Sequence, residues 1–294
     1  MNTSGRTRLR LADGRDLDVH ESGPQGGEVL LFHHGTPGSG AQMRAMADAA
    51  HRLGLRLVSA SRPGYGDSAR FTGRSIVDVV GDSEAILDAL GADRCYVAGW
   101  SGGGPHALAC GARLSERVRA VLVIAGVAPY ESPDLNFLAG MGEENLIEFG
   151  KVLEGEEVLR SYLEEQRANL VHATVPELVE AFGSILPPVD RGVFTGEIGE
   201  DLAAGIQEGL RVGIDGWLDD DLSFVKPWGF ALAEITTPTL LWQGSEDLMV
   251  PFAHGKWLAE RIPGVVAHLE EGEGHLSIAL GSIDLMLQAL VATA

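Results

Sequence analysis

A serine with a glycine two residues before it and another two residues after it is the most informative feature of the sequence. The segment CYVAGWSGGGPHALA at 95–109 places Ser101 between Gly99 and Gly103. An apolar strand pattern precedes the serine, and an Ala/Leu-rich helical pattern follows it. A serine on a sharp turn between a strand and a helix needs such glycines, because side chains there would collide with both elements. The segment therefore predicts Ser101 as a nucleophile on such a turn.

A base and an acid that could activate this serine follow two later strand patterns. A serine hydroxyl becomes a good nucleophile when a histidine removes its proton and a carboxylate orients that histidine. Asp247 follows the pattern at 238–243, and His275 follows the pattern at 265–270. Functional sites in open α/β sheets form outside the carboxyl ends of the strands. We therefore expect Ser101, Asp247 and His275 to converge at one edge of the sheet.

A serine nucleophile that attacks a carbonyl carbon forms a tetrahedral intermediate with a negatively charged oxygen, the oxyanion. Acyl transfer of this kind needs backbone N–H groups that point toward the oxyanion. The strand pattern at 28–33 ends in the Gly/Pro turn HGTPG at 34–38. This turn should lie at the same sheet edge as the serine.

The elements that position these residues alternate between strands and helices, which is typical of a mainly parallel sheet. Asp13-Gly14 suits a tight hairpin turn between the first two strands. Strands are predicted at about 7–11, 16–20, 28–33, 55–60, 94–98 and 120–125, and helices at about 40–52, 76–90 and 103–113.

The alternation stops after residue 130, which indicates a helical insertion. Strands at 238–243 and 265–270 and a last helix from 276 to about 291 then complete the pattern. The acidic run Asp219–Asp221 is expected to form a solvated face rather than a metal site. Helices in the insertion are predicted at 143–153, 156–169, 176–182 and 201–210.

Composition excludes several function classes. The 294 residues contain 22 Lys plus Arg against 42 Asp plus Glu, for a net charge of −20, which disfavours nucleic acid and anionic membranes as partners. The apolar run at 120–128 is shorter than the roughly 20 residues of a membrane span, and the first residues lack a secretory pattern. Cys95 and Cys110 are expected to be buried thiols. A cytoplasmic protein is predicted, either a monomer or a homodimer.

Together these motifs resemble the α/β-hydrolase fold family, in its capped esterase, lyase and peptidase branch. The resemblance rests on HGTPG at 34–38, SRPGYGDS at 61–68, GWSGGG at 99–104, SED at 245–247 and GEGH at 272–275. It implies an α/β-hydrolase fold with a mostly parallel eight-stranded sheet flanked by helices. It also implies that a helical cap at 129–232, inserted after the sixth strand, covers a core formed by 1–128 and 233–294.

The resemblance also assigns roles to further residues. It implies that the backbone N–H groups of Thr36 and Gly102 form the oxyanion hole. Trp100 precedes the nucleophile and should border the substrate pocket, and His34 should be structural beside it. Some family members carry the acid after the sixth strand, where this chain offers Glu131 and Asp134 in place of Asp247. His106 is expected to be packed rather than catalytic.

The reaction predicted from these residues is hydrolysis of a small-molecule carboxylic ester through an acyl-enzyme on Ser101, with no metal or organic cofactor. The alternatives are a proline-iminopeptidase-like aminopeptidase and a hydrolase of carbon–carbon bonds. An aminopeptidase would need a carboxylate in the cap for the substrate's amino group, for which Glu143, Glu144 and Glu148 are candidates. A non-enzymatic small-molecule receptor and cofactor-free oxygen chemistry are further alternatives from other classes.

Overall fold

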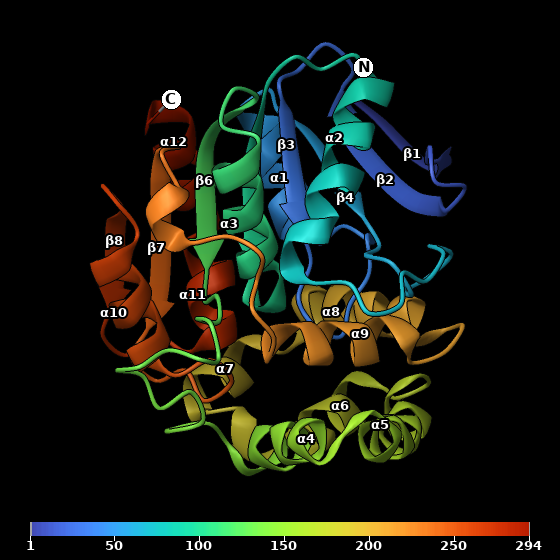
Figure 1. Ribbon diagram of the computed structural model, residues 1–294, viewed down its shortest axis with the longest axis vertical. Helices are drawn as coiled ribbons and strands as arrows, with labels where there is room; N and C mark the ends of the chain where they lie inside the picture. Colours follow the sequence, from blue (N-terminus) through green and yellow to red (C-terminus); the bar gives the residue numbers. More distant parts are fainter. Residues whose placement is uncertain (1, 294) are drawn as a thin grey trace.

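An eight-stranded sheet forms the centre of the molecule in the computed structural model, which describes residues 2–293 (Figure 1). Its strands are β1 (Asn2–Arg10), β2 (Asp16–Pro24), β3 (Val29–His33), β4 (Arg56–Ala60), β5 (Cys95–Trp100), β6 (Val118–Ile124), β7 (Thr239–Gly244) and β8 (Val266–Glu270). They lie in the order β1-β2-β4-β3-β5-β6-β7-β8. β2 pairs antiparallel with β1 and β4, and the other neighbours are parallel. The predicted mostly parallel eight-stranded sheet is confirmed.

β1 and β2 form the hairpin that was predicted at Asp13-Gly14. Gly14 has a φ of 86°, a left-handed value that glycine adopts without a side-chain clash. Residues Asn2 and Pro24 are paired at the open end of the hairpin. Both strands are longer than the sequence pattern predicted, because antiparallel strands can face solvent on one side and then need apolar residues on only one face.

Helices cover both faces of the sheet. They are α1 (Arg44–Arg52), α2 (Val79–Leu90) after a short 3₁₀ turn η1 (Ile76–Asp78), α3 (Gly104–Arg113), α10 (Phe252–Arg261), α11 (His275–Gly281) and α12 (Ile283–Thr293). α1 packs against α12 on one face, and α2 packs against α3 on the other (Figure 1). Every residue of β3 and β5 is buried, as expected for strands covered on both sides. Cys95 and Cys110 are free and buried, as predicted.

The prediction of one continuous helix at the end of the chain is wrong. α11 and α12 are separate helices, bent by 65° at Ser282. Gly281 and Ser282 occupy the break, and both residue types favour a helix less than alanine or leucine does. Between residues 2 and 293 no single helix is long and apolar enough to cross a membrane, although this bent pair passes that test by length and composition.

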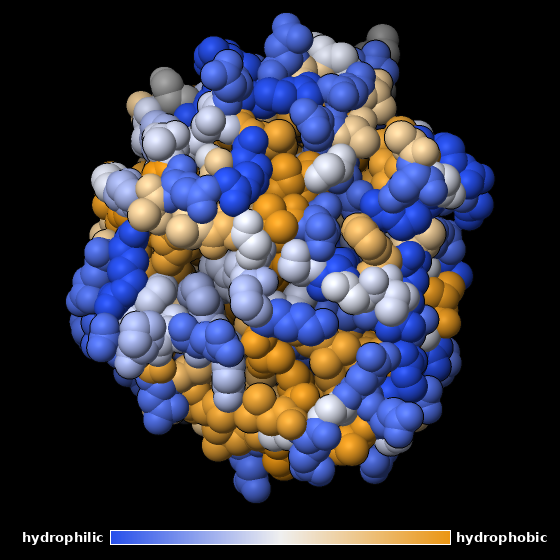
Figure 2. All heavy atoms as spheres, viewed as in Figure 1, coloured by the Kyte–Doolittle hydropathy of each residue, from blue (hydrophilic) through white to orange (hydrophobic). Residues whose placement is uncertain are grey.

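Six α-helices lie between β6 and β7 in the chain and gather below the carboxyl ends of the strands (Figure 1). They are α4 (Glu143–Glu154), α5 (Glu156–Leu170), α6 (Val175–Ala181), α7 (Pro188–Val193), α8 (Gly196–Leu210) and α9 (Asp215–Phe224). We call them the cap helices. Figure 2 shows apolar side chains gathered at this end of the molecule. The exposed apolar residues of α4 and α5 are Leu146, Ile147, Leu153 and Val158.

Two cap helices were missed from the sequence. α7 was missed because its first residue is Pro188, which disfavours a helix interior but is accepted in the first turn, where it needs no partner for an N–H group. α9 was missed because of its acidic run, and the expectation of a solvated face is wrong. Asp219, Asp220 and Asp221 are all buried, with exposed fractions of 3%, 0% and 2%. The first two have arginine partners from the core, which offset the cost of burying a carboxylate.

Candidate active site

Ser101 follows β5 on a strained turn. Its φ is 57°, a left-handed value that is unusual for a residue with a side chain. The flanking glycines leave room for this turn. A Cβ at Gly99 would overlap the Gly103 carbonyl, and a Cβ at Gly103 would overlap the His33 carbonyl. The G-x-S-x-G spacing is therefore a steric requirement of the path between β5 and α3.

His275 and Asp247 lie together at the carboxyl ends of β8 and β7. His275 Nδ1 and Asp247 Oδ2 are 2.8 Å apart, and both side chains are buried. The same carboxylate accepts hydrogen bonds from Gln243 Nε2 at 2.9 Å and from the Met249 and Val250 backbone N–H groups at 2.9 and 2.8 Å. Asp247 is thus held by its own loop in the position that orients the imidazole.

The carboxylate also sets the protonation of the histidine. Burial lowers the pKa of His275, but the charge and hydrogen bond of Asp247 outweigh burial and raise this pKa above its usual 6.5. An imidazole whose Nδ1–H is bound by a carboxylate presents Nε2 as the free base. The Trp100 ring lies 5.5 Å from the His275 ring, tilted by 30°, and limits the space in which the imidazole can turn.

Ser101 and His275 line the same cavity, although no hydrogen bond joins their side chains among the described residues. Catalytic hydrogen bonds are often loose without substrate and tighten in the complex. Glu131 and Asp134, the alternative acids, do not reach His275. Asp134 bonds to Arg261, and Glu131 is exposed.

The turn after β3 lies against the nucleophile turn. A Cβ at Gly102 would overlap the Thr36 side chain, and a Cβ at Gly35 would lie 3.5 Å from Ser101 Cβ. Thr36 and Gly102 are therefore adjacent, as an oxyanion hole built from their backbone N–H groups requires.

A buried ion-pair network that the sequence did not reveal holds this turn. Asp220 of α9 accepts hydrogen bonds from Thr36 Oγ1 at 2.7 Å, Arg62 Nη2 at 2.7 Å, Arg74 Nη2 at 2.6 Å and Tyr65 OH at 2.9 Å. Arg62 Nη2 also donates to the Gly35 carbonyl at 2.9 Å. Burial raises the pKa of Asp220, but Arg62 and Arg74 lower it well below its usual range. Asp220 is therefore an anion at neutral pH, and it links a cap helix to the oxyanion turn.

His34 and Trp100, the two predicted pocket residues, both line the cavity. The Arg62 N–H donates to His34 Nε2 at 3.0 Å, so the proton of His34 lies on Nδ1, which faces the Gly35 carbonyl at 2.7 Å. Burial lowers the pKa of His34 well below 6.5 and keeps the ring neutral. Both ring nitrogens of His34 are thus occupied, so this histidine does not compete with His275 as a base. His106 is fully buried, as predicted.

The cavity has a volume of about 210 Å³ and lies between the sheet edge and the cap helices. Its lining is mostly apolar, and includes Phe149, Leu170, Ile185, Ile206, Trp217 and Phe224. Such a lining suits the apolar part of a small organic molecule.

Four carboxyl groups interrupt the apolar lining, from Glu144 and Glu148 of α4, Asp201 of α8 and Asp221 of α9. Glu144 accepts a hydrogen bond from Ser184, and Asp201 accepts one from Arg44, whereas Glu148 and Asp221 lie next to each other. Trp217 Nε1 donates to Glu148 Oε1 at 2.9 Å, whereas Asp221 Oδ2 has no hydrogen-bond donor among the described residues. Burial raises the pKa of both groups, and the neighbouring Glu148 charge adds to the effect at Asp221, whose pKa lies well above 3.8. Of the three candidates named from the sequence, Glu144 and Glu148 line the cavity and Glu143 does not. Asp221 was missed, because its partner Glu148 lies on a different helix.

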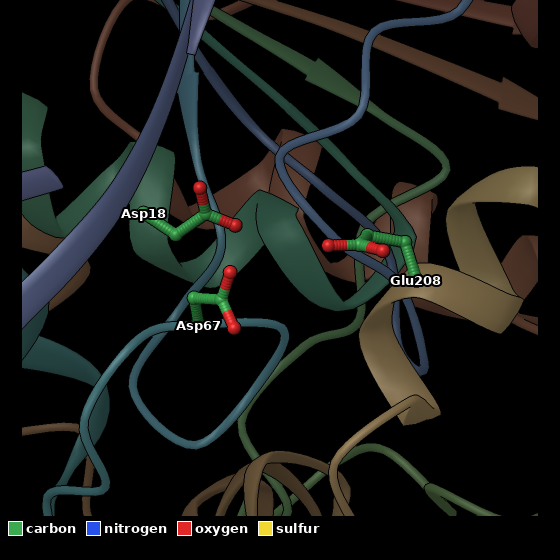
Figure 3. Close-up of side chains that lie close together, drawn as sticks. All are labelled: Asp18, Asp67 and Glu208. Atoms are coloured by element: carbon green, nitrogen blue, oxygen red, sulfur yellow. The ribbon is translucent and has the colours of Figure 1, made fainter. Parts of the chain in front are cut away.

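A cluster of three acids outside the cavity has the spacing of a metal site. Asp18, Asp67 and Glu208 point toward one another in Figure 3. The Arg6 guanidinium binds all three, at 2.6, 2.9 and 2.7 Å respectively. An arginine therefore already supplies the positive charge that a cation would bring.

Comparisons with known proteins agree with this fold. Residues 28–151 match the family model described as alpha/beta hydrolase fold. The chain is 30% identical over 188 residues to a 2-hydroxy-6-oxo-2,4-heptadienoate hydrolase of Pseudomonas putida, with 61% of this chain and 67% of that protein covered. It is 24% identical to a bifunctional esterase/perhydrolase of Acinetobacter calcoaceticus, with 85% of this chain and 86% of that protein covered.

Two further similarities extend along nearly the whole chain. A proline iminopeptidase of Neisseria meningitidis is 24% identical, with 96% of this chain and 94% of that protein covered. The crystal structure of epoxide hydrolase A from Mycobacterium thermoresistibile superposes with a TM-score of 0.71 at 20% identity, covering 97% of this chain and 98% of that one. Together with the eight-stranded sheet, these matches show that the protein belongs to the α/β-hydrolase fold family.

Proposed function

We propose that the protein is a serine hydrolase that cleaves a small-molecule carboxylic ester through an acyl-enzyme on Ser101. The observation that carries this proposal is the left-handed Ser101 in one cavity with a histidine that is bound to Asp247 at 2.8 Å. An ester is favoured over an amide because an alkoxide leaves more easily than an amine. The esterase/perhydrolase relative supports the same reaction class.

In the proposed mechanism, His275 Nε2 removes the proton from Ser101 Oγ as the oxygen attacks the substrate carbonyl carbon. The N–H groups of Thr36 and Gly102 stabilise the oxyanion, and loss of one such donor typically costs about 10²- to 10³-fold in turnover. The tetrahedral intermediate collapses to the acyl-enzyme, and His275 returns the proton to the leaving alcohol. Water activated by the same histidine then attacks the acyl carbon and releases the acid.

Ser101→Ala tests the nucleophile directly. We expect the kcat/KM for p-nitrophenyl esters, measured from acetate to octanoate, to fall by about 10⁴-fold or more, because no oxygen remains to form the acyl-enzyme. The wild type should also react covalently with a small fluorophosphonate at Ser101, as measured by intact mass, and the variant should not. A variant that keeps wild-type turnover would overturn the assignment of Ser101 as nucleophile.

An amine-bearing substrate is the second candidate, and the Glu148–Asp221 pair favours it. A substrate ammonium group would donate hydrogen bonds to both carboxyls and would displace the proton that this neighbouring pair retains. The similarity to a proline iminopeptidase supports such a substrate. This candidate keeps the same nucleophile and base and changes the acyl group to an aminoacyl group.

Removing the pair by Glu148→Gln combined with Asp221→Asn separates the two candidates. If the pair binds an ammonium group, kcat/KM for prolyl p-nitroanilide should fall tenfold or more, while that for p-nitrophenyl acetate should change little. The matched control is Glu143→Gln, on the same helix but outside the cavity lining. Equal turnover of prolyl and N-acetylprolyl p-nitroanilide by the wild type would contradict the aminopeptidase candidate.

A further inference from the structure

A carboxylate from the cap binds the backbone that carries His275. Asp190 lies in α7, is fully buried, and accepts the His275 N–H at 2.8 Å on Oδ2. Its Oδ1 accepts the Leu276 N–H at 3.0 Å and the Ser277 N–H at 2.9 Å. One carboxylate thus binds three consecutive N–H groups at the start of α11. These groups have no partner within the helix, and a buried helix end needs one from elsewhere.

The sequence around the histidine leaves space for this contact. A Cβ at Gly274 would overlap the Asp190 carboxylate, so the residue before His275 must lack a side chain for Asp190 to approach. The Gly274 N–H in turn donates to Ser277 Oγ at 2.8 Å. Hydrogen bonds therefore fix the backbone on both sides of His275. One of the residues that accept them, Asp190, is 85 positions away in the chain.

His275 is held at two points by two different parts of the molecule. Asp247 of the core binds the imidazole at Nδ1, and Asp190 of the cap binds the main chain of the same residue. Asp247 determines the orientation of the imidazole ring, whereas Asp190 determines the position of the main chain that carries it. A displacement of about 1 Å at a reacting group can cost about 10²-fold in rate, so both contacts bear on the position of Nε2.

We infer that Asp190 is a positioning residue for His275, and that the cap therefore helps to assemble the catalytic base rather than only covering the pocket. The inference rests on the proposed function, in which His275 is the base for Ser101. It assigns a second role to Asp190, because a carboxylate at this place also stabilises the imidazolium that forms during the reaction.

The charged groups that face His275 come from three places. Asp247 follows β7, Asp190 comes from α7, and Glu273 precedes the histidine on its own turn, where Ser277 Oγ binds its carboxylate. Asp190 and Asp247 both raise the pKa of His275 against the effect of burial. Burial also raises the pKa of Asp190 itself, and the three N–H groups and His275 offset part of this effect. Removal of Asp190 should therefore lower the pKa of the base.

The test measures the rate of Ser101 phosphonylation by a small fluorophosphonate as a function of pH, which needs no knowledge of the natural substrate. For Asp190→Ala we expect the plateau rate to fall tenfold or more and the midpoint of the acid limb to move to lower pH. Asp190→Asn keeps one oxygen for the Leu276 and Ser277 N–H groups but loses the charge. Its plateau should therefore lie between those of wild type and Asp190→Ala, with the midpoint still displaced.

The matched control is Arg44→Gln, which removes contacts between α1 and the cap helix α8 at Asp201 and Glu200 but none of the hydrogen bonds to the α11 backbone. This variant should keep the wild-type midpoint. If Asp190→Asn, folded by its thermal transition, reacts at the wild-type rate with an unchanged midpoint, the inference is overturned. It is also overturned if both variants lose rate equally with no change of midpoint, since that would show a general cap contact. Failure of the wild type to react would instead reject the proposed function.

Discussion

At the scale of single residues, the site depends on strain and on paired hydrogen bonds. Ser101 is held in a left-handed conformation only because two glycines leave room around it. Such strain costs of the order of 1–3 kcal/mol and persists where the surrounding structure imposes it. Here the surrounding structure is the passage from a fully buried strand to a buried helix, which directs the hydroxyl toward the cavity.

The pH dependence of the reaction belongs to this scale. His275 must be neutral to remove a proton, and its pKa is raised above 6.5 in the folded protein. Activity should therefore be high above that pKa and fall as the pH drops through it, with a midpoint of kcat/KM above 6.5. The measurement is kcat/KM for p-nitrophenyl acetate across the stable pH range.

Asp247→Asn provides the comparison for that profile. Loss of the carboxylate should lower turnover by about 10⁴-fold, because the imidazole loses the partner that fixes its tautomer. The residual activity should have its midpoint at lower pH, since the anion that raises the pKa of His275 is absent. A midpoint below 6.5 in the wild type would show that burial outweighs Asp247 and would contradict the raised pKa of His275.

At the scale of elements, helix α9 and the turn after β3 depend on one buried carboxylate. Asp220 binds Arg62 and Arg74, and all three side chains are almost completely excluded from solvent. A buried ion pair contributes little net stability compared with an apolar replacement, but removal of one partner leaves a buried charge unpaired.

Asp220→Ala should consequently lower the free energy of unfolding by about 3–5 kcal/mol. It should also lower kcat, because Thr36 loses a hydrogen-bond partner. The pKa of Asp220 is depressed in the folded state, so its contribution to stability is present above the unfolded carboxyl pKa and is lost as the pH falls through the folded value. Urea denaturation of the wild type and of Asp220→Ala at several pH values measures the loss of stability and its dependence on pH.

The neighbouring Asp219→Ala is the control for that experiment. Asp219 binds Arg70, whose side chain is 25% exposed and has further acidic partners in Asp215 and Glu156. Its loss should cost less, since water can reach the remaining guanidinium. Equal destabilisation by the two substitutions would contradict the claim that Asp220 stabilises the fold by pairing with buried arginines.

At the scale of the whole molecule, arginines of the core and carboxylates of the cap join the two parts. Arg6, Arg44, Arg62 and Arg70 each contact an acid in α8 or α9, namely Glu208, Asp201, Asp220 and Asp219. The net charge of −20 therefore includes cap carboxylates that bind the core. One further cap carboxylate, Asp190, binds backbone N–H groups beside the base. Through these contacts the cap helices are bound both to the core and to the backbone of His275.

The sheet, the hairpin and the order of the proposed catalytic groups could all be predicted from the amino-acid sequence. These features depend on local patterns: runs of apolar residues, glycines at required turns, and loops after parallel strands that must meet at one edge. Ser101, Asp247 and His275 were predictable because each lies within a few residues of the end of a strand. Asp13-Gly14 was predictable because a tight turn has its own residue preferences.

The roles of the acidic residues in the cap, by contrast, depend on how distant helices pack together. Asp219, Asp220 and Asp221 look alike in the sequence, yet the first binds Arg70, the second binds Arg62 and Arg74, and the third lies against Glu148 at the cavity wall. Asp220 and Arg62 are 158 positions apart, and no local period relates them. Whether a carboxylate is buried, paired or left free to meet a ligand depends on packing between distant helices. This is why the cap's contribution to the site emerges from the fold and not from the sequence.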